Sequence, residues 1–283
     1  MTDTALALGS FDGLHIAHMK VLSSAASCSA VAVLFDVPPA MEMSGKRELL
    51  LPLEEKHKIL ENMGFSVEVL DFSAVKDVFA EDFLLGLYET YAPRKICCGF
   101  NYSFGKGGKG NTEKLKAFCN QKGIELCIID AVEMDGSAVS STRIRELLKS
   151  GDIRSANKLL GRDYAVKGRV SHGDKRGRTL GYPTVNFMYP QDMCEVKHGV
   201  YATTVMLENN EYCAVTYVGK RPTYKLDDTI CETNIIDFKG DLYEKEITVN
   251  FRRFLREEKT FNSVDELVKQ IYNDIKAAKE EKL

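Results

Sequence analysis

Short apolar runs alternate with segments of helical spacing through the first half of the chain. The runs predict buried strands at 6–10, 30–35, 65–70, 95–99 and 126–130. The intervening segments repeat apolar residues every three or four positions and predict helices at 15–26, 52–63, 82–91, 112–121 and 141–149. Strands that alternate with helices indicate a parallel sheet covered by helices on both faces.

The pattern changes from Tyr164 onward to short β-branched segments with a period of two. Turn signals such as Asn209–Asn210 separate strands predicted at 164–170, 199–207, 211–218, 229–238 and 245–254. This spacing is typical of an antiparallel β-barrel or sandwich. A terminal amphipathic helix is predicted over 264–279, opened by a capping box of Ser263 and Glu266.

The change of pattern divides the 283 residues into two predicted domains. An α/β domain covers residues 1–155 and a β-barrel domain covers residues 156–283, with the boundary near Gly151–Asp163. The net charge of −3 does not indicate a nucleic-acid partner. With neither a signal-like N-terminus nor an apolar run of spanning length, we expect a cytoplasmic protein without a membrane partner.

The eight cysteines do not indicate disulfides or a zinc site. They contain no C-x-x-C pair, and several lie in apolar strand-like runs. We expect them all to be free thiols in a reducing compartment.

The first candidate site is the turn GSFDGLHIAH, from Gly9 to His18, between the first strand and the first helix. In an open α/β sheet, ligands bind at the carboxyl ends of the strands, and a helix N-terminus there favours phosphate. His15 and His18 share one face of the helical turn, where they can stabilise charge in a nucleotidyl-transfer transition state. Alone, the same turn also fits a capped helix with two surface histidines.

A second segment, SSTRIR from Ser140 to Arg145, opens the last helix of this half. The hydroxyls of Ser141 and Thr142, the helix N-terminus and Arg145 one turn later together suit a phosphate. The segment fits a capped helix with a solvated arginine equally well.

These segments look like the H-x-G-H and S-S-T-x-x-R motifs of nucleotidyltransferases. With FNYSFG (Phe100–Gly105) and LPLEEK (Leu51–Lys56), the first half resembles the FMN adenylyltransferase domain of prokaryotic bifunctional riboflavin kinase/FAD synthetases. The resemblance implies a Rossmann-like parallel sheet and catalytic roles for His15, His18, Asn101 and Arg145. It also implies ATP and phosphate binding by Gly9, Phe11, Asp12, Gly13, Ser141 and Thr142.

The chain departs from this family pattern at several positions. Ala17 replaces a usual glycine, Val37 and Pro38 stand where the pattern F-x-P-H-P has its histidine, and Ala138 stands where a basic residue is common. The last two departures remove possible phosphate contacts.

The second candidate site is the glycine-rich basic segment from Gly168 to Asn186, which joins two strand-like runs. Backbone N–H groups of such a loop can hold an anion, and the oxygens of Thr184 and Asn186 suit a phosphate-bound Mg²⁺. The loop alone favours a surface hairpin with solvated charges.

The whole segment, with G-x-P-T-x-N at Gly181–Asn186, resembles the riboflavin kinase signature. Downstream segments follow in family order, including CETNIIDF (Cys231–Phe238), GDLY (Gly240–Tyr243) and FLREEK (Phe254–Lys259). The resemblance implies that Glu232 is the catalytic base for the ribityl 5′-hydroxyl and that Thr184 and Asn186 bind the metal. It also implies ATP and phosphate binding by Gly168, Arg169, His172, Gly173, Gly181, Pro183, Thr184 and Asn186, and flavin binding by Arg256 and Phe261. Tyr217 replaces a usual asparagine, and Asn234 replaces a common histidine.

The leading hypothesis is therefore a bifunctional enzyme that uses ATP and Mg²⁺ to phosphorylate riboflavin to FMN and then to adenylylate FMN to FAD, releasing pyrophosphate. The alternative is a riboflavin kinase whose adenylyltransferase domain is weak or inactive. A flavin- or nucleotide-binding regulator with a catalytically inactive barrel is disfavoured by the intact Thr184, Asn186 and Glu232. A nucleotidyltransferase joined to an RNA-binding β-barrel is disfavoured by the net charge and by the lack of clustered aromatic residues on a basic face.

Overall fold

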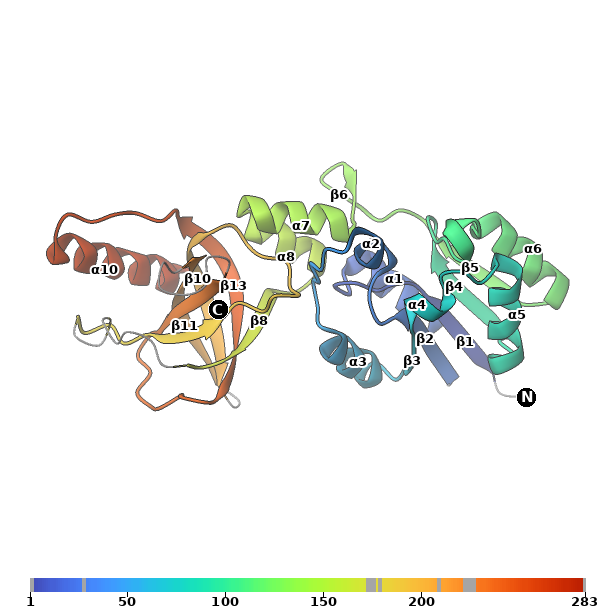
Figure 1. Cartoon of the computed structure of the whole chain (residues 1–283), viewed down its shortest axis with the longest axis horizontal. Coiled ribbons are helices and arrows are strands. Elements are labelled where there is room, and N and C mark those ends of the chain that lie inside the picture. Colours follow the sequence, from blue (N-terminus) through green and yellow to red (C-terminus); the bar gives the residue numbers. More distant parts are fainter. Residues whose placement is uncertain are drawn as a thin grey trace. The chain divides into compact units, whose positions relative to one another are not determined.

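The computed structural model describes residues 3–26, 29–171, 177, 180–207, 210–220 and 228–281. The chain forms two compact units, Met1–Ser141 and Thr142–Leu283. Figure 1 labels most of the elements along the chain.

The first unit is built on a five-stranded parallel sheet in the order β3-β2-β1-β4-β5. The strands are β1 (Thr4–Leu8), β2 (Ser29–Phe35), β3 (Ser66–Leu70), β4 (Lys95–Gly99) and β5 (Glu125–Ile129). All five residues of β1 are buried, as its central position requires. The predicted parallel sheet is confirmed.

Helices cover both faces of this sheet. The main helices are α1 (Ile16–Ala25), α3 (Leu53–Asn62), α5 (Ala80–Tyr91) and α6 (Thr112–Lys122). Ala5 and Ala7 of β1 pack with α1 and α3 on one face. Leu6 and Leu8 pack with α5 and α6 on the other. Because side chains alternate along a strand, this single strand contributes to both hydrophobic cores.

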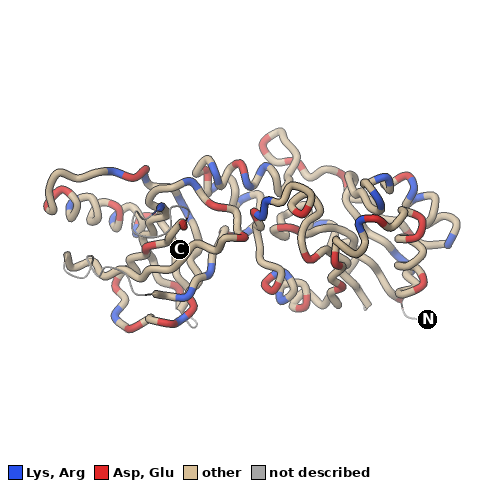
Figure 2. Tube along the Cα trace, in the orientation of Figure 1, with Lys and Arg blue, Asp and Glu red and all other residues tan. Residues whose placement is uncertain are grey.

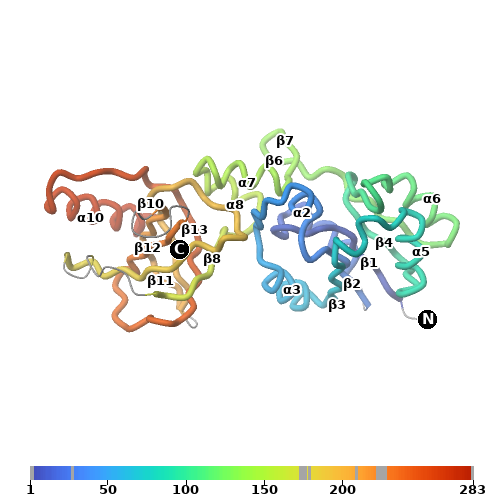
Figure 3. Tube along the Cα trace, in the orientation of Figure 1, coloured from blue at the N-terminus to red at the C-terminus, as the bar shows by residue number. Residues whose placement is uncertain are grey.

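Short elements that the apolar pattern did not predict connect the main ones. They are α2 (Pro39–Ser44), α4 (Phe72–Val75), the 3₁₀ turn Lys106–Gly108, β6 (Glu133–Met134) and β7 (Ser137–Ala138). Figure 3 shows β6 and β7 as a hairpin before α7. Elements of this length carry too few apolar positions to show a period.

The second unit is a six-stranded antiparallel sheet in the order β8-β13-β10-β11-β12-β9. Its strands are β8 (Tyr164–Arg169), β9 (Val185–Met188), β10 (Gly199–Leu207), β11 (Asn210–Lys220), β12 (Thr229–Ile235) and β13 (Glu246–Arg256). The strand β9 was not among the bounded strand predictions, although the basic segment was expected to end in a strand-like run, because four residues beside Gly181 and Pro183 carry little strand signal.

The sheet closes into a barrel where β8 meets β9. The Ser171 N–H donates a hydrogen bond of 2.7 Å to the Asn186 carbonyl, and these residues form an antiparallel bridge. A Cβ at Gly168 would lie 1.9 Å from Cδ2 of the buried Phe187 ring. Gly168 therefore leaves the space into which Phe187 packs along the closing seam, and the predicted barrel is confirmed.

Two helices precede the barrel, α7 (Ser141–Ser150) and α8 (Ile153–Leu160). The prediction of a domain boundary near 151–163 did not anticipate α8, a short helix between Asp152, whose side chain caps the Ser155 N–H, and Gly161 in the left-handed conformation. Its apolar residues are buried, and α8 contacts β8 and β13.

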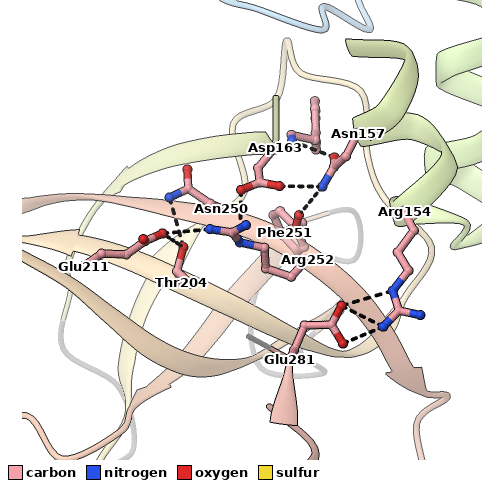
Figure 4. A network of polar contacts seen from close by, with 10 residues as sticks. Arg154, Asn157, Asp163, Thr204, Glu211, Asn250, Phe251, Arg252 and Glu281 are labelled. Atoms are coloured by element: carbon pink, nitrogen blue, oxygen red, sulfur yellow. Dashed lines mark hydrogen bonds and ion pairs between the residues drawn. The ribbon is translucent and has the colours of Figure 1, made fainter. Parts of the chain in front are cut away.

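A polar network fixes α8 and the C-terminal helix to the barrel (Figure 4). Arg252 of β13 forms ion pairs of 3.0 Å with both Asp163 and Glu211. Arg154 of α8 makes a two-pronged contact with Glu281. Burial raises the pKa of Asp163, and Arg252 opposes that rise.

The terminal helix α10 (Val264–Glu280) packs on β10 and β11 and confirms the predicted helix. The Glu266 N–H donates to the Ser263 hydroxyl, while the Glu266 carboxylate accepts from the N–H of Asn262. Among the described residues, no helix is long and apolar enough to cross a membrane. Acidic and basic positions are interspersed along the trace (Figure 2).

Candidate functional site

The first candidate site lies at the topological switch point of the parallel sheet. From β1 the chain moves to β2 on one side, whereas β4 lies on the other side of β1. The carboxyl ends of β1 and β4 therefore flank the crevice at which open α/β sheets bind ligands. The Gly9–His18 turn follows β1, and the exposed Asn101 follows β4.

The backbone of this turn is unusual. Phe11 and Leu14 have φ of +48° and +42°, and Gly13 has φ of +82°. The Phe11 ring is buried over Gly9, where a Cβ would lie 3.1 Å from ring atoms. Gly9 thus allows a close approach by Phe11, and Gly13 accommodates the left-handed conformation.

Asp12 anchors the turn from within the protein. Its side chain is buried, and Oδ1 accepts a 3.1 Å hydrogen bond from the Leu50 N–H. Its carbonyl accepts a 2.9 Å hydrogen bond from the Ser141 hydroxyl. Asp12 and Ser141 therefore hold the shape of the turn, and their predicted ATP contacts stay predictions.

His15 and His18 stack on each other with ring centroids 3.5 Å apart. His15 is the N-cap of α1, and its Nδ1 accepts from the His18 N–H at 3.3 Å. In a neutral His15, this contact places the ring proton on Nε2. Burial, the nearby His15 and Lys56 hold the pKa of His18 well below its usual value.

The Nδ1 atom of His18 is buried and has no hydrogen-bond partner among the described residues. A buried polar atom without a partner is costly unless a water or ligand satisfies it. His18 is therefore suited to a ligand that enters at the start of α1.

Lys56 is a candidate that the sequence analysis did not place in the site. This α3 residue is 1 % exposed, and its Nζ donates a 3.1 Å hydrogen bond to the Ser10 carbonyl. Burial lowers its pKa, while Asp12 opposes the shift. The family motif Leu51–Lys56 ends on this lysine and could have indicated its role. A lysine on an amphipathic helix, however, is usually exposed to solvent.

The remaining predicted residues of the first site belong to other elements of the chain. Thr142 is exposed and Arg145 half-buried on the first turns of α7, within the second unit. Ala138 is exposed on β7. Pro38 is the N-cap of α2 and follows the half-buried Val37. The position that holds a histidine in the family pattern therefore starts a helix here.

The second candidate site centres on Glu232 in β12. Its cross-strand partners are Asn186 in β9 and Tyr217 in β11. Directly opposed residues share one face of a sheet, so these three side chains form a row. The Thr184 hydroxyl donates a 2.7 Å hydrogen bond to Oε1 of Glu232.

A pocket lies beside this row and is lined in part by the other face of β12. Thr233 and Ile235 line it, and side chains at these positions point away from the Glu232 face. Thr184 lines the pocket and also contacts Glu232. Further lining residues are Val170, Pro183, Val185, Phe238, Gly240, Asp241, Leu242 and Tyr243.

The glycine-rich loop is described only in part. His172 and Gly173 lie outside the described residues. Gly168 has the packing role given above, and the exposed Arg169 pairs with Glu244 at 3.0 Å. Gly181 has φ of +85° and open space around it. Asn234 donates a 2.7 Å hydrogen bond to the Pro183 carbonyl and so fixes the segment that carries Thr184.

Arg256 and Phe261 lie on and just after β13. Arg256 makes a two-pronged ion pair with the buried Asp274 of α10, with its closest contact at 2.9 Å. Its guanidinium carbon lies 5.8 Å from the centroid of the half-buried Phe261 ring. Arg256 is therefore held between an acid and an aromatic ring.

The two halves match two families of enzymes that use ATP. A family model described as FAD synthetase matches residues 1–143, and one described as riboflavin kinase matches residues 160–281. A "Bifunctional riboflavin kinase/FMN adenylyltransferase" of Listeria monocytogenes is 33 % identical, covering 95 % of this chain and 89 % of that protein. A protein of the same name from Bacillus subtilis is 32 % identical over 96 % and 90 % of the two chains. The chain belongs to the family of bifunctional riboflavin kinase/FMN adenylyltransferases.

A solved structure supports the fold over nearly the whole length. It is titled "Crystal Structure of Macrolide-efflux Protein from Streptococcus pneumoniae" and is 30 % identical, with a TM-score of 0.90. The similarity covers 98 % of this chain and 94 % of that one.

Proposed function

We propose that this chain phosphorylates riboflavin to FMN in its barrel and transfers AMP from ATP to FMN in its α/β unit. The observation that carries the proposal is the Thr184–Glu232 hydrogen bond at the rim of the pocket, within a chain of this family. We assign the adenylyltransferase to residues 1–155, the kinase to residues 156–283 and the protein to the cytoplasm.

In the kinase reaction, ATP occupies the pocket and riboflavin lies on the Glu232 face of β12. Glu232 accepts the proton of the ribityl 5′-hydroxyl as that oxygen attacks the γ-phosphorus, and ADP leaves. The hydrogen bond from Thr184 helps to orient the carboxylate for this proton transfer. Most of the catalysis then comes from positioning.

Oxygens of Thr184, at the pocket rim, and of Asn186, beside Glu232, fit a magnesium ion. Mg²⁺ prefers oxygen ligands and is commonly held by a few protein groups together with substrate phosphates. The hydroxyl of Thr184 and the side-chain oxygen of Asn186 would hold it. When bound, Mg²⁺ would offset the negative charge of the ATP phosphates.

In the adenylyltransferase reaction, an FMN phosphate oxygen attacks the α-phosphorus of ATP and pyrophosphate leaves. We assign binding of the ATP phosphates to the Gly9–His18 turn, with His15 donating from Nε2. His18 and Lys56 stabilise the charge that builds up in the transition state. The family motifs also imply catalytic roles for Asn101 and Arg145 and phosphate binding by Thr142.

The test is a chromatographic assay of the purified chain with ATP and Mg²⁺. Riboflavin should give FMN and then FAD, and FMN supplied alone should give FAD with one pyrophosphate per turnover. FMN from riboflavin without any FAD would favour the kinase-only alternative, to which Pro38 and Ala138 point. No conversion of either flavin would contradict both functions.

A further inference from the structure

We propose that Tyr217 is a positioning residue of the riboflavin site, which places the segment Glu257–Phe261 for binding of the flavin. This inference rests on the proposed kinase function, because it concerns the acceptor of that reaction. Tyr217 also marks a departure of this chain, since the riboflavin kinase pattern usually has an asparagine there.

The register of the barrel places Tyr217 between Glu232 and Arg256. Across the strands, Glu232 pairs with Tyr217, Tyr217 with Val200, and Val200 with Arg256. Glu232, Tyr217 and Val200 share one face, because directly opposed residues in a sheet do. Arg256 follows next to Val200 at a β-bulge, where the register between β10 and β13 shifts. Three interstrand steps of ~4.8 Å separate Glu232 from Arg256, about 14 Å along the sheet.

A riboflavin molecule whose 5′-hydroxyl meets Glu232 must extend away from the pocket, since ATP comes from there. Following the row of residues, it passes over Tyr217 towards Arg256 and Phe261. Tyr217 is half-buried, and its ring offers an apolar surface with a polar tip.

The hydroxyl end of Tyr217 is held by its surroundings. A Cβ at Gly219 would lie 2.2 Å from the Tyr217 Oη, so the glycine leaves space for the phenol. The hydroxyl donates a 3.1 Å hydrogen bond to Oε1 of Glu258. This bond ties β11 to the segment that follows β13.

Further contacts hold the same segment on either side of Glu258. The neighbouring Glu257 pairs with Lys197 at 2.8 Å, and Lys259 lies 5.6 Å from the Phe261 ring centroid. Arg256 donates to the Glu257 carbonyl at 3.1 Å. Tyr217 thus provides the connection between this segment and the strand next to Glu232.

The test compares Tyr217→Phe, Glu258→Gln and the double variant with the parent chain. The control is Tyr272→Phe, which alters a tyrosine that is 60 % exposed on α10. Riboflavin binding is followed by the quenching of its fluorescence, and the kinase by the riboflavin and ATP dependence of FMN formation.

We expect each single variant to raise the riboflavin Kd and KM by about two- to tenfold, the size of one solvent-exposed hydrogen bond. The KM for ATP, kcat at saturating riboflavin and the FMN-to-FAD rate should stay roughly unchanged. The double variant should bind riboflavin no more weakly than the weaker-binding single variant, because both substitutions remove the same hydrogen bond.

An unchanged riboflavin Kd in both single variants would overturn the inference. So would losses in kcat and in ATP affinity as large as the loss in riboflavin affinity. A parent chain that binds no riboflavin would overturn it too. A parent chain that makes FMN while the variants bind riboflavin equally well would leave the proposed function intact and remove only the role of Tyr217.

Discussion

The hydroxyl of Thr184 lies 2.7 Å from Oε1 of Glu232 and donates a hydrogen bond to it. The two residues come from β12 and from the segment just before β9, 48 positions apart in the chain. The contact joins a residue that lines the pocket to a carboxylate on the opposite face of the strand. It is the point at which the proposed phosphate donor and acceptor meet.

Replacement of Thr184 by valine should reduce FMN formation about a hundredfold, because the carboxylate loses an orienting donor and the proposed metal loses a ligand. Thr184→Ser keeps the hydroxyl and should retain most of the activity. Steady-state rates of FMN formation at several Mg²⁺ concentrations measure both effects. Equal activity in the valine and serine variants would contradict the assignment.

Glu232→Gln should abolish most FMN formation, since the amide cannot accept the 5′-hydroxyl proton at neutral pH. The same variant should convert supplied FMN to FAD at the rate of the parent chain. Separate assays from riboflavin and from FMN measure the two steps. Loss of both activities in a folded variant would count against independent sites.

Lys56→Met should slow FMN-to-FAD conversion about a hundredfold, because a buried cation beside the Gly9–His18 turn is removed. FMN formation should be roughly unchanged. Lys58→Met is the matched control on the same helix, where Lys58 is exposed and pairs with Glu54 at 2.6 Å. A parent-like rate of FAD synthesis in Lys56→Met would remove Lys56 from the site.

The lowered pKa of His18 makes the stability of the first unit sensitive to mild acid. The unfolded chain protonates this histidine near pH 6.5, whereas the folded chain does so only at lower pH. The contribution of the neutral His18 to the free energy of unfolding is therefore complete above pH 6.5. It is lost as the pH falls below that value, by at most about 1.4 kcal/mol per pH unit.

Urea unfolding between pH 7.5 and 5 would measure this dependence in the parent chain and in His18→Gln. The variant should show a shallower loss of unfolding free energy below pH 6.5. Parallel curves for the two proteins would show that His18 titrates normally.

Gly168→Ala should destabilise the barrel by about 1–3 kcal/mol, because the new methyl group overlaps the Phe187 ring. Combining it with Phe187→Leu should restore part of the loss. Gly86→Ala provides a control in α5, where a Cβ meets no atom within 4 Å, and it should be neutral or stabilising by about 0.5–1 kcal/mol. Thermal or urea denaturation compares the four proteins, and a parent-like Gly168→Ala would refute the packing role.

Much of the fold follows from the periodicity of apolar residues. The strand β1 and the helix α10 were predictable because long or uninterrupted patterns carry their own signal. The helix α8 and the strand β9 were missed because each is short, and neighbouring elements rather than local sequence supply most of their stability.

The candidate sites were predictable where motif and position coincide, as for the turn after β1. Lys56 and Tyr217 were not, because their roles depend on tertiary packing and on strand register. A pattern along one segment does not reveal which residue of another strand will face it. Asp12 is the opposite case. It lies inside the motif, but its side chain makes a structural hydrogen bond that holds the turn.

The two faces of β12 have a kinetic consequence. If ATP fills the pocket behind the strand while riboflavin lies in front of it, neither molecule blocks the entry of the other, and both must be present before phosphate moves. Initial-rate plots should then intersect, as expected for a ternary complex, and no phosphorylated enzyme should accumulate when ATP is supplied alone. The strand β12 would then lie between the two substrates, and their reacting groups would meet beside Thr184.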